Sequence, residues 1–344
     1  MGGTEETLFS MTQIVDPSTI LSQEEIRREN VLLKNIFTGC ATALQGIIWC
    51  ARRRLLGNSS SCGNCNIPMS CTKRAKLIVD GYVWSCKKCP KLVTIRKNSF
   101  FEKSKLSLEQ ILILIHGWAE ELPQDYIARL ARIEGNHTIL YWFNLCREVC
   151  EKYFIMNSIT VGGLNEDGTS KIVECKFFHR KYHCGRWIDD NWVFGGIERG
   201  TKKCFLVEVP NKTEATYSAL IERYLLEFLH GFIHIKLRYI LPGSIIVSDG
   251  WRSYGSIHNI GGGLYEHQVN IHEENIVDPN DNCIHTQNVR NMWMRAKKKL
   301  RRQFVSSEAM LQSYLHDFVW KNQFSKIQVF SEFLNAVVAQ YPVK

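Results

Sequence analysis

The chain has 344 residues, of which 45% are hydrophobic and 22% are charged, and its net charge is +9. This composition is typical of folded proteins and excludes a disordered or fibrous chain, and the length can hold two or three domains. The positive charge favours polyanionic partners. The longest uncharged run, 35–50, contains polar residues and is too short to span a bilayer, so we expect no membrane role.

Residues 1–25 are polar and are expected to be mobile. From Glu24 to Leu56 the apolar residues recur at helical spacing, and Ser22 is a suitable N-cap, so the pattern predicts a helical segment over 26–57. The thirteen cysteines are unevenly clustered, and the polar N-terminus does not resemble a signal peptide. We therefore expect a reducing compartment and a metal site rather than disulfides.

Two Cys-x-x-Cys pairs dominate the next segment, residues 58–102. Each pair can supply two thiolates to one metal ion, and four thiolates complete a tetrahedral structural Zn²⁺ site. The twenty residues between the pairs are within the range found in zinc ribbons. The predicted ligands are Cys62, Cys65, Cys86 and Cys89.

The segment 77–84 predicts a hairpin with its turn at Asp80-Gly81, which would carry the second cysteine pair on a strand. Cys71 is a spare candidate ligand. The other cysteines show no ligand spacing and are expected to be small buried side chains. They are Cys40, Cys50, Cys146, Cys150, Cys175, Cys184, Cys204 and Cys283.

Basic residues of this module, Arg96 and Lys97 among them, are candidates for contacts with DNA phosphates, and a solvated charged surface is the alternative. The following segment, 103–160, predicts a helical module whose last helix begins near Asn136, after a short Gly-Asn turn. Helix-turn-helix recognition of DNA and a packing spacer between domains are both open interpretations of this module.

After a predicted linker at 162–170, the segment 165–305 predicts an α/β domain. Strands are expected at 172–178, 192–198, 204–210, 244–248 and 265–270, and helices at 214–230 and 288–304. The fourth strand ends in Ser248-Asp249-Gly250 and so presents one carboxylate at its C-terminal end, where a helix-capping role is the alternative.

The order of these elements matches an RNase H-like fold. The motifs are KIVECKFFHRKYHCGR, WVFGGIERGTKK, SIIVSDGWRSY and VDPNDNCIHTQNVRNMW, preceded by the cysteine module and TIRKNSFFEKSKLSLEQIL. In this order, over residues 45–300, they resemble a Merlin-type DNA transposase and the related bacterial insertion-sequence transposases. The resemblance implies a DDE-type site in which three carboxylates hold two Mg²⁺ or Mn²⁺ ions for cleavage and strand transfer of double-stranded DNA.

Carried over by position, the second family carboxylate is Asp249, while the first and third fall on Val173 and Arg290. Glu174, next in sequence, is expected to face away from Asp249 because successive strand residues alternate. We expect Arg290 to pair with Asp249 and Mg²⁺ or Mn²⁺ to be absent. The resemblance therefore predicts a transposase-derived, nuclear, DNA-binding protein without strand-transfer activity.

Further DNA contacts are predicted at Arg180 and Lys181, after the first strand, and at Lys297 and Lys298, in a cationic run that is alternatively the solvated side of a packed helix. Residues 306–344 predict C-terminal helices packed on the α/β domain. Three other functions remain open: an active transposase with an altered site, a non-catalytic scaffold built as a homo-oligomer, and a decaying element copy. No small-molecule substrate is expected.

Overall fold

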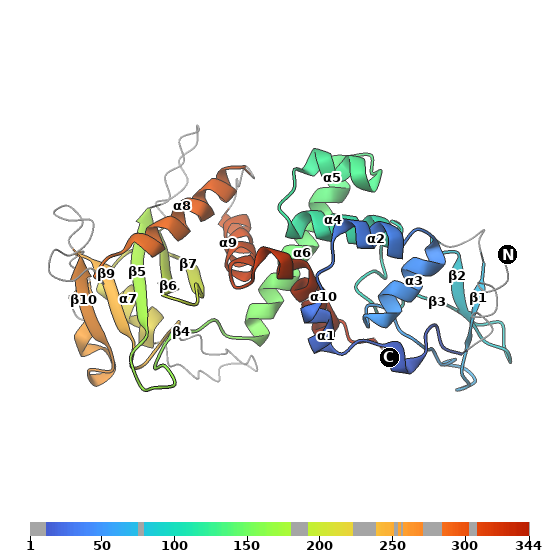
Figure 1. The fold of residues 1–344 in the computed structure, drawn as a ribbon, viewed down its shortest axis with the longest axis horizontal. Helices are drawn as coiled ribbons and strands as arrows, with labels where there is room; N and C mark the ends of the chain where they lie inside the picture. The colour runs from blue at the N-terminus through green and yellow to red at the C-terminus, as the bar shows by residue number, and fades with distance from the viewer. Residues whose placement is uncertain are drawn as a thin grey trace. The chain divides into compact units, whose positions relative to one another are not determined.

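The computed structural model describes residues 12–74, 79–179, 192–222, 239–250, 254–255, 257–270, 284–302 and 308–343. The chain is a mixed α/β protein that divides into two compact units (Figure 1). Unit 1 holds Met1–Val149 with Phe324–Lys344, and unit 2 holds Cys150–Gln323. The boundary therefore lies inside helix α6 (Asn136–Met156) and not in a linker at 162–170.

The predicted linker at 162–170 is an ordered turn of unit 2. Leu164 and Ser170 form an antiparallel bridge, and the N–H of Asn165 donates to the carbonyl of Thr169 at 2.8 Å. The Gly and Asp residues of this segment thus form a tight turn. Turns and linkers are rich in the same residues, so composition alone did not distinguish them.

Unit 1 begins with a 3-10 helix in the segment expected to be mobile, and short helices follow where the sequence predicts a helical segment. They are η2 (Pro17–Thr19), α1 (Gln23–Arg28), α2 (Leu33–Gly39) and α3 (Ala43–Arg52). The predicted cap is confirmed, because Ser22 and Glu25 form a capping box at α1. The expectation that residues 1–25 are mobile is wrong for 12–25, since Ile14 is 1% exposed and its N–H donates to the Asn58 carbonyl. Residues 1–11 lie outside the described residues.

The cysteine module contains a three-stranded antiparallel sheet of β1 (Ser70–Lys73), β2 (Tyr82–Ser85) and β3 (Leu92–Thr94). The predicted hairpin at 77–84 is displaced along the chain, because the strand that pairs with β2 is β1. Gly81, with φ of 68°, precedes β2 and accepts a hydrogen bond from the N–H of Arg74. Residues 75–78 lie outside the described residues.

The helical part of unit 1 continues with α4 (Leu108–Ala119), α5 (Gln124–Ala131) and the start of α6, and ends with η5 (Lys326–Gln328) and α10 (Val329–Gln340). Helix α10 contacts α1 and α4. Its Phe330 and Phe333 rings lie 5.0 and 4.9 Å from those of His116 and Trp118. The tail 306–344 therefore divides: its first helix, α9 (Glu308–Asn322), packs on β7 of the α/β unit, and α10 belongs to unit 1.

Unit 2 is built on a five-stranded sheet whose strands begin and end within two residues of the predicted positions. They are β5 (Ile172–His179), β6 (Trp192–Glu198), β7 (Cys204–Val209), β9 (Ile245–Asp249) and β10 (Glu266–Asn270). The order is β10-β9-β5-β6-β7; β5, β6 and β7 are antiparallel, whereas β5, β9 and β10 are parallel. Two short strands, β4 (Val161–Gly162) and β8 (Ile240–Leu241), pair separately.

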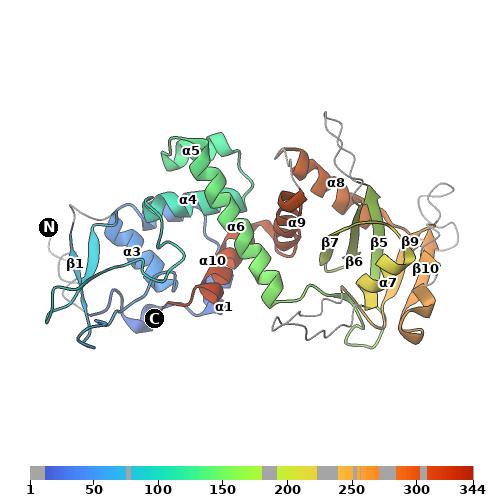
Figure 2. The ribbon, with the colours of Figure 1, turned by 180° about the vertical axis from the view of Figure 1, so that it is seen from behind.

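Helices cover both faces of this sheet (Figure 2). Helices α8 (Gln287–Arg302) and α9 contact the sheet strands, and α7 (Glu214–Glu222) contacts η4 (Ile257–Gly262). Val173, Cys175 and Ile246 are buried in one cluster with Ile221 of α7 and Ile257 of η4. The alternate residues of β5 therefore face α8, where the Phe178 ring stacks on that of Trp293 at 4.7 Å.

Helix α8 approaches β6 closely because β6 carries glycine there. A Cβ atom at Gly195 would lie 2.7 Å from Leu206 Cδ2 and 3.3 Å from Met292 Cε of α8. Across the described residues, no helix combines the length and the apolar character that a membrane crossing requires.

Candidate functional site

The four predicted cysteine ligands lie together in unit 1. The sulfur atoms of Cys62, Cys65, Cys86 and Cys89 are all within 4.8 Å of one another, and those of Cys62 and Cys89 are 3.5 Å apart. Four sulfurs at about 2.3 Å from a tetrahedral zinc ion would be separated by about 3.8 Å. The cluster could therefore hold a metal ion such as zinc, and it is compatible with a zinc ribbon.

Backbone N–H groups in both turns point at these sulfurs. The N–H groups of Asn64 and then Cys65 hold the pKa of the Cys62 thiol down, to about 6, and the N–H of Lys88 donates to Cys86 Sγ at 3.4 Å. Such donors favour the thiolate form of the sulfur that accepts them, whereas hydrogen bonds with the neighbouring thiols, Cys89 first, raise the pKa of Cys65 to about 12. The positive φ of Asn66, 53°, belongs to the first of these turns.

Cys71, the spare candidate, belongs to the core and not to this cluster. It is fully buried on β1, and burial raises the pKa of its thiol to about 12. Six of the other cysteines are buried as predicted; they are Cys40, Cys50, Cys146, Cys150, Cys175 and Cys204. Cys184 and Cys283 lie outside the described residues.

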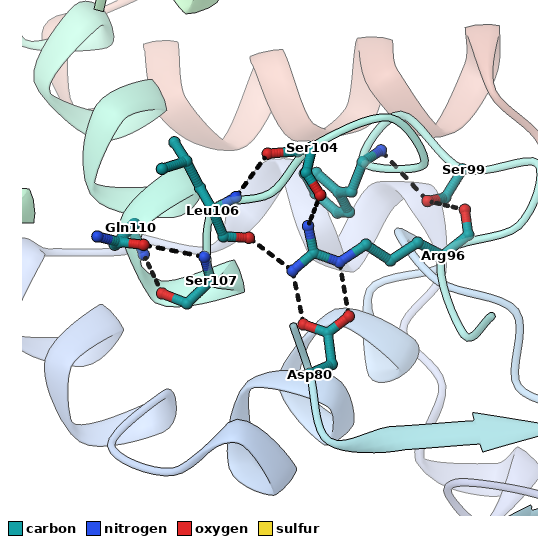
Figure 3. Close-up of polar contacts among 8 residues, drawn as sticks. Asp80, Arg96, Ser99, Ser104, Leu106, Ser107 and Gln110 are labelled. Atoms are coloured by element: carbon teal, nitrogen blue, oxygen red, sulfur yellow. Dashed lines mark hydrogen bonds and ion pairs between the residues drawn. The ribbon is translucent and has the colours of Figure 1, made fainter. Parts of the chain in front are cut away.

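Arg96, a predicted DNA contact, is instead a buried structural residue (Figure 3). It is 4% exposed, and its Nε and Nη2 each donate to the Asp80 carboxylate at 2.6 Å. The same guanidinium donates to the carbonyls of Ser104 and Leu106 at 3.2 and 2.7 Å. Arg96 is therefore not accessible to a DNA phosphate, and its prediction as a DNA contact is wrong. The physical reason is that the Asp80 carboxylate already neutralises the guanidinium inside the unit.

Lys97, the next predicted contact, is exposed. The two helices predicted for this module are also present: Arg132, with φ of 52°, caps the C-terminus of α5, and α6 begins at Asn136 as predicted. Leu140 and Tyr141 near the start of α6 are 42% and 54% exposed. This exposed surface is compatible with either interpretation of the module, DNA recognition or a packing spacer.

In unit 2, Asp249 ends strand β9 and is paired with a lysine. Lys176 Nζ lies 2.5 Å from Asp249 Oδ2, and the two side chains are 20% and 22% exposed. In the parallel register Cys175 is opposite Ser248, so Lys176 is next to Asp249 on the same face of the sheet. No local sequence pattern marks Lys176 as the partner of Asp249, because the two residues are 73 positions apart in the chain.

The register corrects the predicted places of Val173 and Glu174. Val173 is opposite Ile246 and is fully buried in the cluster on the α7 side. Glu174 has the same parity along β5 as Lys176, so it shares the face of Asp249, contrary to our expectation. On ideal strand spacings the two carboxylate-bearing residues are roughly 8 Å apart.

Glu174 is fully buried and is saturated with hydrogen bonds. Its Oε1 accepts from Arg199 Nε and Asn288 Nδ2, both at 2.7 Å, and its Oε2 accepts from the backbone N–H of Val289 at 3.1 Å. His285 Nδ1 lies 3.3 Å from Oε1. Glu174 thus caps the first turn of α8, where a carboxylate is stabilised by free N–H groups and the helix dipole.

The first turn of α8 also carries Arg290, which the sequence resemblance assigns to the third carboxylate position. Burial lowers the pKa of its guanidinium, and the Asp249 carboxylate opposes this shift. The expected ion pair of Arg290 with Asp249 is made by Lys176 instead. Among the described residues, Arg290 Nε and Asp249 Oδ1 are buried atoms without a hydrogen-bond partner. We call Glu174, Lys176, Asp249 and Arg290 the Asp249 site.

The remaining predicted contacts are on α8 or outside the described residues. Lys298 is exposed and Lys297 is partly exposed, whereas Lys299 is directed to the buried Asp317 of α9, at 3.0 Å. Arg180 and Lys181 lie outside the described residues.

Comparison with known families gives a match to part of unit 2. Residues 188–323 match the family model of the ISXO2-like transposase domain. The match runs from just before β6 to the end of α9, and so includes Asp249 and Arg290. No curated protein matches the chain.

Proposed function

The chain is a relative of the insertion-sequence transposases, and we propose that it is a transposase-derived DNA-binding protein without strand-transfer activity. The observation that carries the proposal is the ion pair between Lys176 and Asp249, which gives the surviving carboxylate a protein cation as its partner. We assign unit 2 to the RNase H-like class, and its strand order, with three antiparallel strands followed by two parallel ones, supports this assignment.

A pair of Mg²⁺ or Mn²⁺ ions, typical of the family, does not fit the residues present. Such ions need several oxygen ligands, with octahedral geometry for Mg²⁺. Glu174 already accepts from Arg199, Asn288 and the α8 backbone, and Asp249 pairs with Lys176. A permanently charged guanidinium, that of Arg290, is at the third position. These side chains therefore do not offer the oxygen ligands that a pair of divalent ions requires.

Three features support double-stranded DNA as the partner: the family relationship, the net charge of +9 and the basic side chains Lys97, Lys297 and Lys298, which are at least partly exposed. The four-cysteine cluster supports a zinc-stabilised module of the kind that presents such residues. The cationic run at 295–302 supports nuclear import as part of the same proposal.

The test is a paired assay of the full chain on duplex DNA, for binding and for cleavage with Mn²⁺. We expect binding that weakens steeply with salt, and no nicks above those seen with Asp249→Asn. Duplex binding that is absent at low salt would refute the DNA-binding part. Nicking that disappears in Asp249→Asn would refute the loss of catalysis.

A second candidate function, an active transposase with an altered site, is favoured by one observation: Glu174 and Asp249 share a face of the sheet. In that case both carboxylates would bind metal after leaving their present partners. Glu174→Gln would then abolish Mn²⁺-dependent nicking as fully as Asp249→Asn does, whereas our main proposal predicts no nicking to abolish.

A further inference from the structure

The Asp249 site and its neighbour Arg199 together carry one more positive than negative charge. Two carboxylates, Glu174 and Asp249, lie here together with three cationic side chains, Lys176 of β5, Arg199 of the turn after β6 and Arg290 of α8. Lys176 pairs with Asp249 and Arg199 with Glu174. Arg290 is left as the cation of the site that has no ion pair among the described residues.

Arg290 is also the first member of a line of cations along α8. Residues seven and eleven positions later, Lys297 and Arg301, return to nearly the same side of a helix with 3.6 residues per turn. Lys298 lies beside them, and both it and Arg301 are exposed. The opposite side of α8 is apolar, with Met292 and Ala296 buried. The line extends for about 17 Å, at 1.5 Å per residue, which is about five nucleotide steps of a duplex at 3.4 Å each.

In a metal-dependent site of this kind, divalent ions perform two tasks: they neutralise the carboxylates and they bind the DNA phosphate. We propose that here Lys176 performs the first task and Arg290 the second, so that the Asp249 site holds a backbone phosphate of duplex DNA without a divalent ion. Arg290 is suited to this contact because a guanidinium can donate two parallel hydrogen bonds to phosphate oxygens. The inference rests on the proposed DNA-binding function and deepens it.

The geometry explains why Asp249 does not repel the phosphate. Its Oδ2 is held by Lys176 at 2.5 Å, and its Oδ1 is buried away from solvent. The Lys176–Asp249 pair therefore presents almost no net charge to an approaching phosphate. The charge that the phosphate meets is that of Arg290. The cations of α8 extend the same contact along the backbone.

The test is the salt dependence of duplex binding by the full chain, in buffer without divalent ions. Each phosphate contact contributes about 0.9 to the slope of log K against log salt. We expect Arg290→Gln to lower this slope by about 0.9 and Arg290→Lys to retain it. Lys203→Gln is the matched control, since it removes one charge from an exposed position in the turn before β7, and it should leave the slope unchanged.

A second variant tests the role of Lys176. Lys176→Met leaves Asp249 without its cation, so we expect weaker duplex binding that Mn²⁺ partly restores. The double variant Lys176→Met/Asp249→Asn removes both charges, and its binding should not respond to Mn²⁺. Thermal unfolding of each variant separates a lost contact from a lost fold.

The outcomes distinguish this inference from the function on which it rests. A wild-type chain that binds duplex DNA while Arg290→Gln keeps the full salt slope would overturn the inference alone. Wild-type binding that appears only with Mn²⁺ would also overturn it. Absence of duplex binding by the wild type would instead remove the proposed function.

Discussion

Arg96 and Asp80 form a buried, two-pronged ion pair that joins the start of β2 to the segment preceding α4. Both hydrogen bonds are 2.6 Å long, and the Arg96 guanidinium also binds the carbonyls of Ser104 and Leu106 (Figure 3). Because Ser107 and Gln110 form the capping box of α4 directly after these carbonyls, the pair fixes the cysteine module against the entry of that helix.

Removing one partner of this pair should destabilise unit 1. Arg96→Met leaves the Asp80 carboxylate buried without a cation, and breaking such pairs costs about 3–5 kcal/mol of unfolding free energy. Denaturant unfolding would measure the loss. The matched control is Lys97→Met, which removes the same charge from an exposed neighbour and should leave stability unchanged. Equal stability of the two variants would contradict the structural role of Arg96.

The same two variants should have the opposite order in DNA binding. If Lys97 contacts phosphate, Lys97→Met lowers the salt slope by about 0.9, whereas Arg96→Met, measured at a temperature where it is folded, should not. Arg96→Met with a reduced salt slope and an intact fold would show that the original sequence prediction was right.

The cysteine cluster should bind one zinc ion per chain through four thiolates. Replacing the ion with Co²⁺ would give the visible absorption of a tetrahedral thiolate site, and Cys89→Ser should weaken it and lower the melting temperature. Cys71→Ala is the control, because Cys71 is a buried core side chain outside the cluster. A Co²⁺ spectrum that changes in Cys71→Ala and not in Cys89→Ser would contradict the ligand assignment.

Local patterns in the sequence were sufficient to predict the clustering of four cysteines and the five strands of unit 2. The spacing of two cysteine pairs restricts which atoms can meet, and a β-branched run such as 244–248 has few alternatives to a strand. The family motifs around Asp249 and Arg290 are also short and contiguous, and the structure brings the two side chains close enough for the carboxylate to act on the guanidinium.

Local patterns could not predict on which face of the sheet a side chain lies or which residue is its ion-pair partner. Whether Val173 or Glu174 faces Asp249 depends on the β5–β9 register, which joins segments more than seventy residues apart. Likewise, Arg96 resembles an exposed DNA contact until its partner Asp80, on another part of the module, is known. Both errors concern side chains whose role is set by a distant residue and not by the local pattern.

Unit 2 should lose stability in mildly acidic solution. Burial lowers the pKa of His267 to about 4, with a smaller effect from His258, and burial alone lowers that of His316 to about 4. In the unfolded chain both histidines become protonated below about pH 6.5, whereas in the folded unit they stay neutral until about pH 4. Stability should thus be constant above pH 6.5 and should fall progressively from pH 6.5 to about 4.

Denaturant unfolding at pH 7 and pH 5 would measure this loss. His267→Gln/His316→Gln should reduce the difference between the two pH values, because a glutamine can keep the hydrogen bonds to Ser248 and Gln312 without titrating. The exposed His137→Gln serves as the control. An unchanged pH dependence in the double variant would show that other groups cause the loss.

Restoring the family carboxylates at the positions given by the sequence motif should fail. Val173→Asp places a carboxylate among Ile221, Ile246 and Ile257, on the face away from Asp249. An uncompensated buried charge of this kind costs at least about 3–5 kcal/mol, so Val173→Asp/Arg290→Glu should unfold more easily than the wild type and bind no Mn²⁺.

By contrast, Lys176→Ser/Arg290→Glu removes both cations from the Asp249 face, adds a carboxylate there and leaves Val173 in place. We expect this second variant to stay folded and to gain Mn²⁺ binding, measured by calorimetry and abolished by Asp249→Asn. Mn²⁺ binding by the first variant and not by the second would contradict the facing of Val173 and Glu174 that the β5–β9 register assigns.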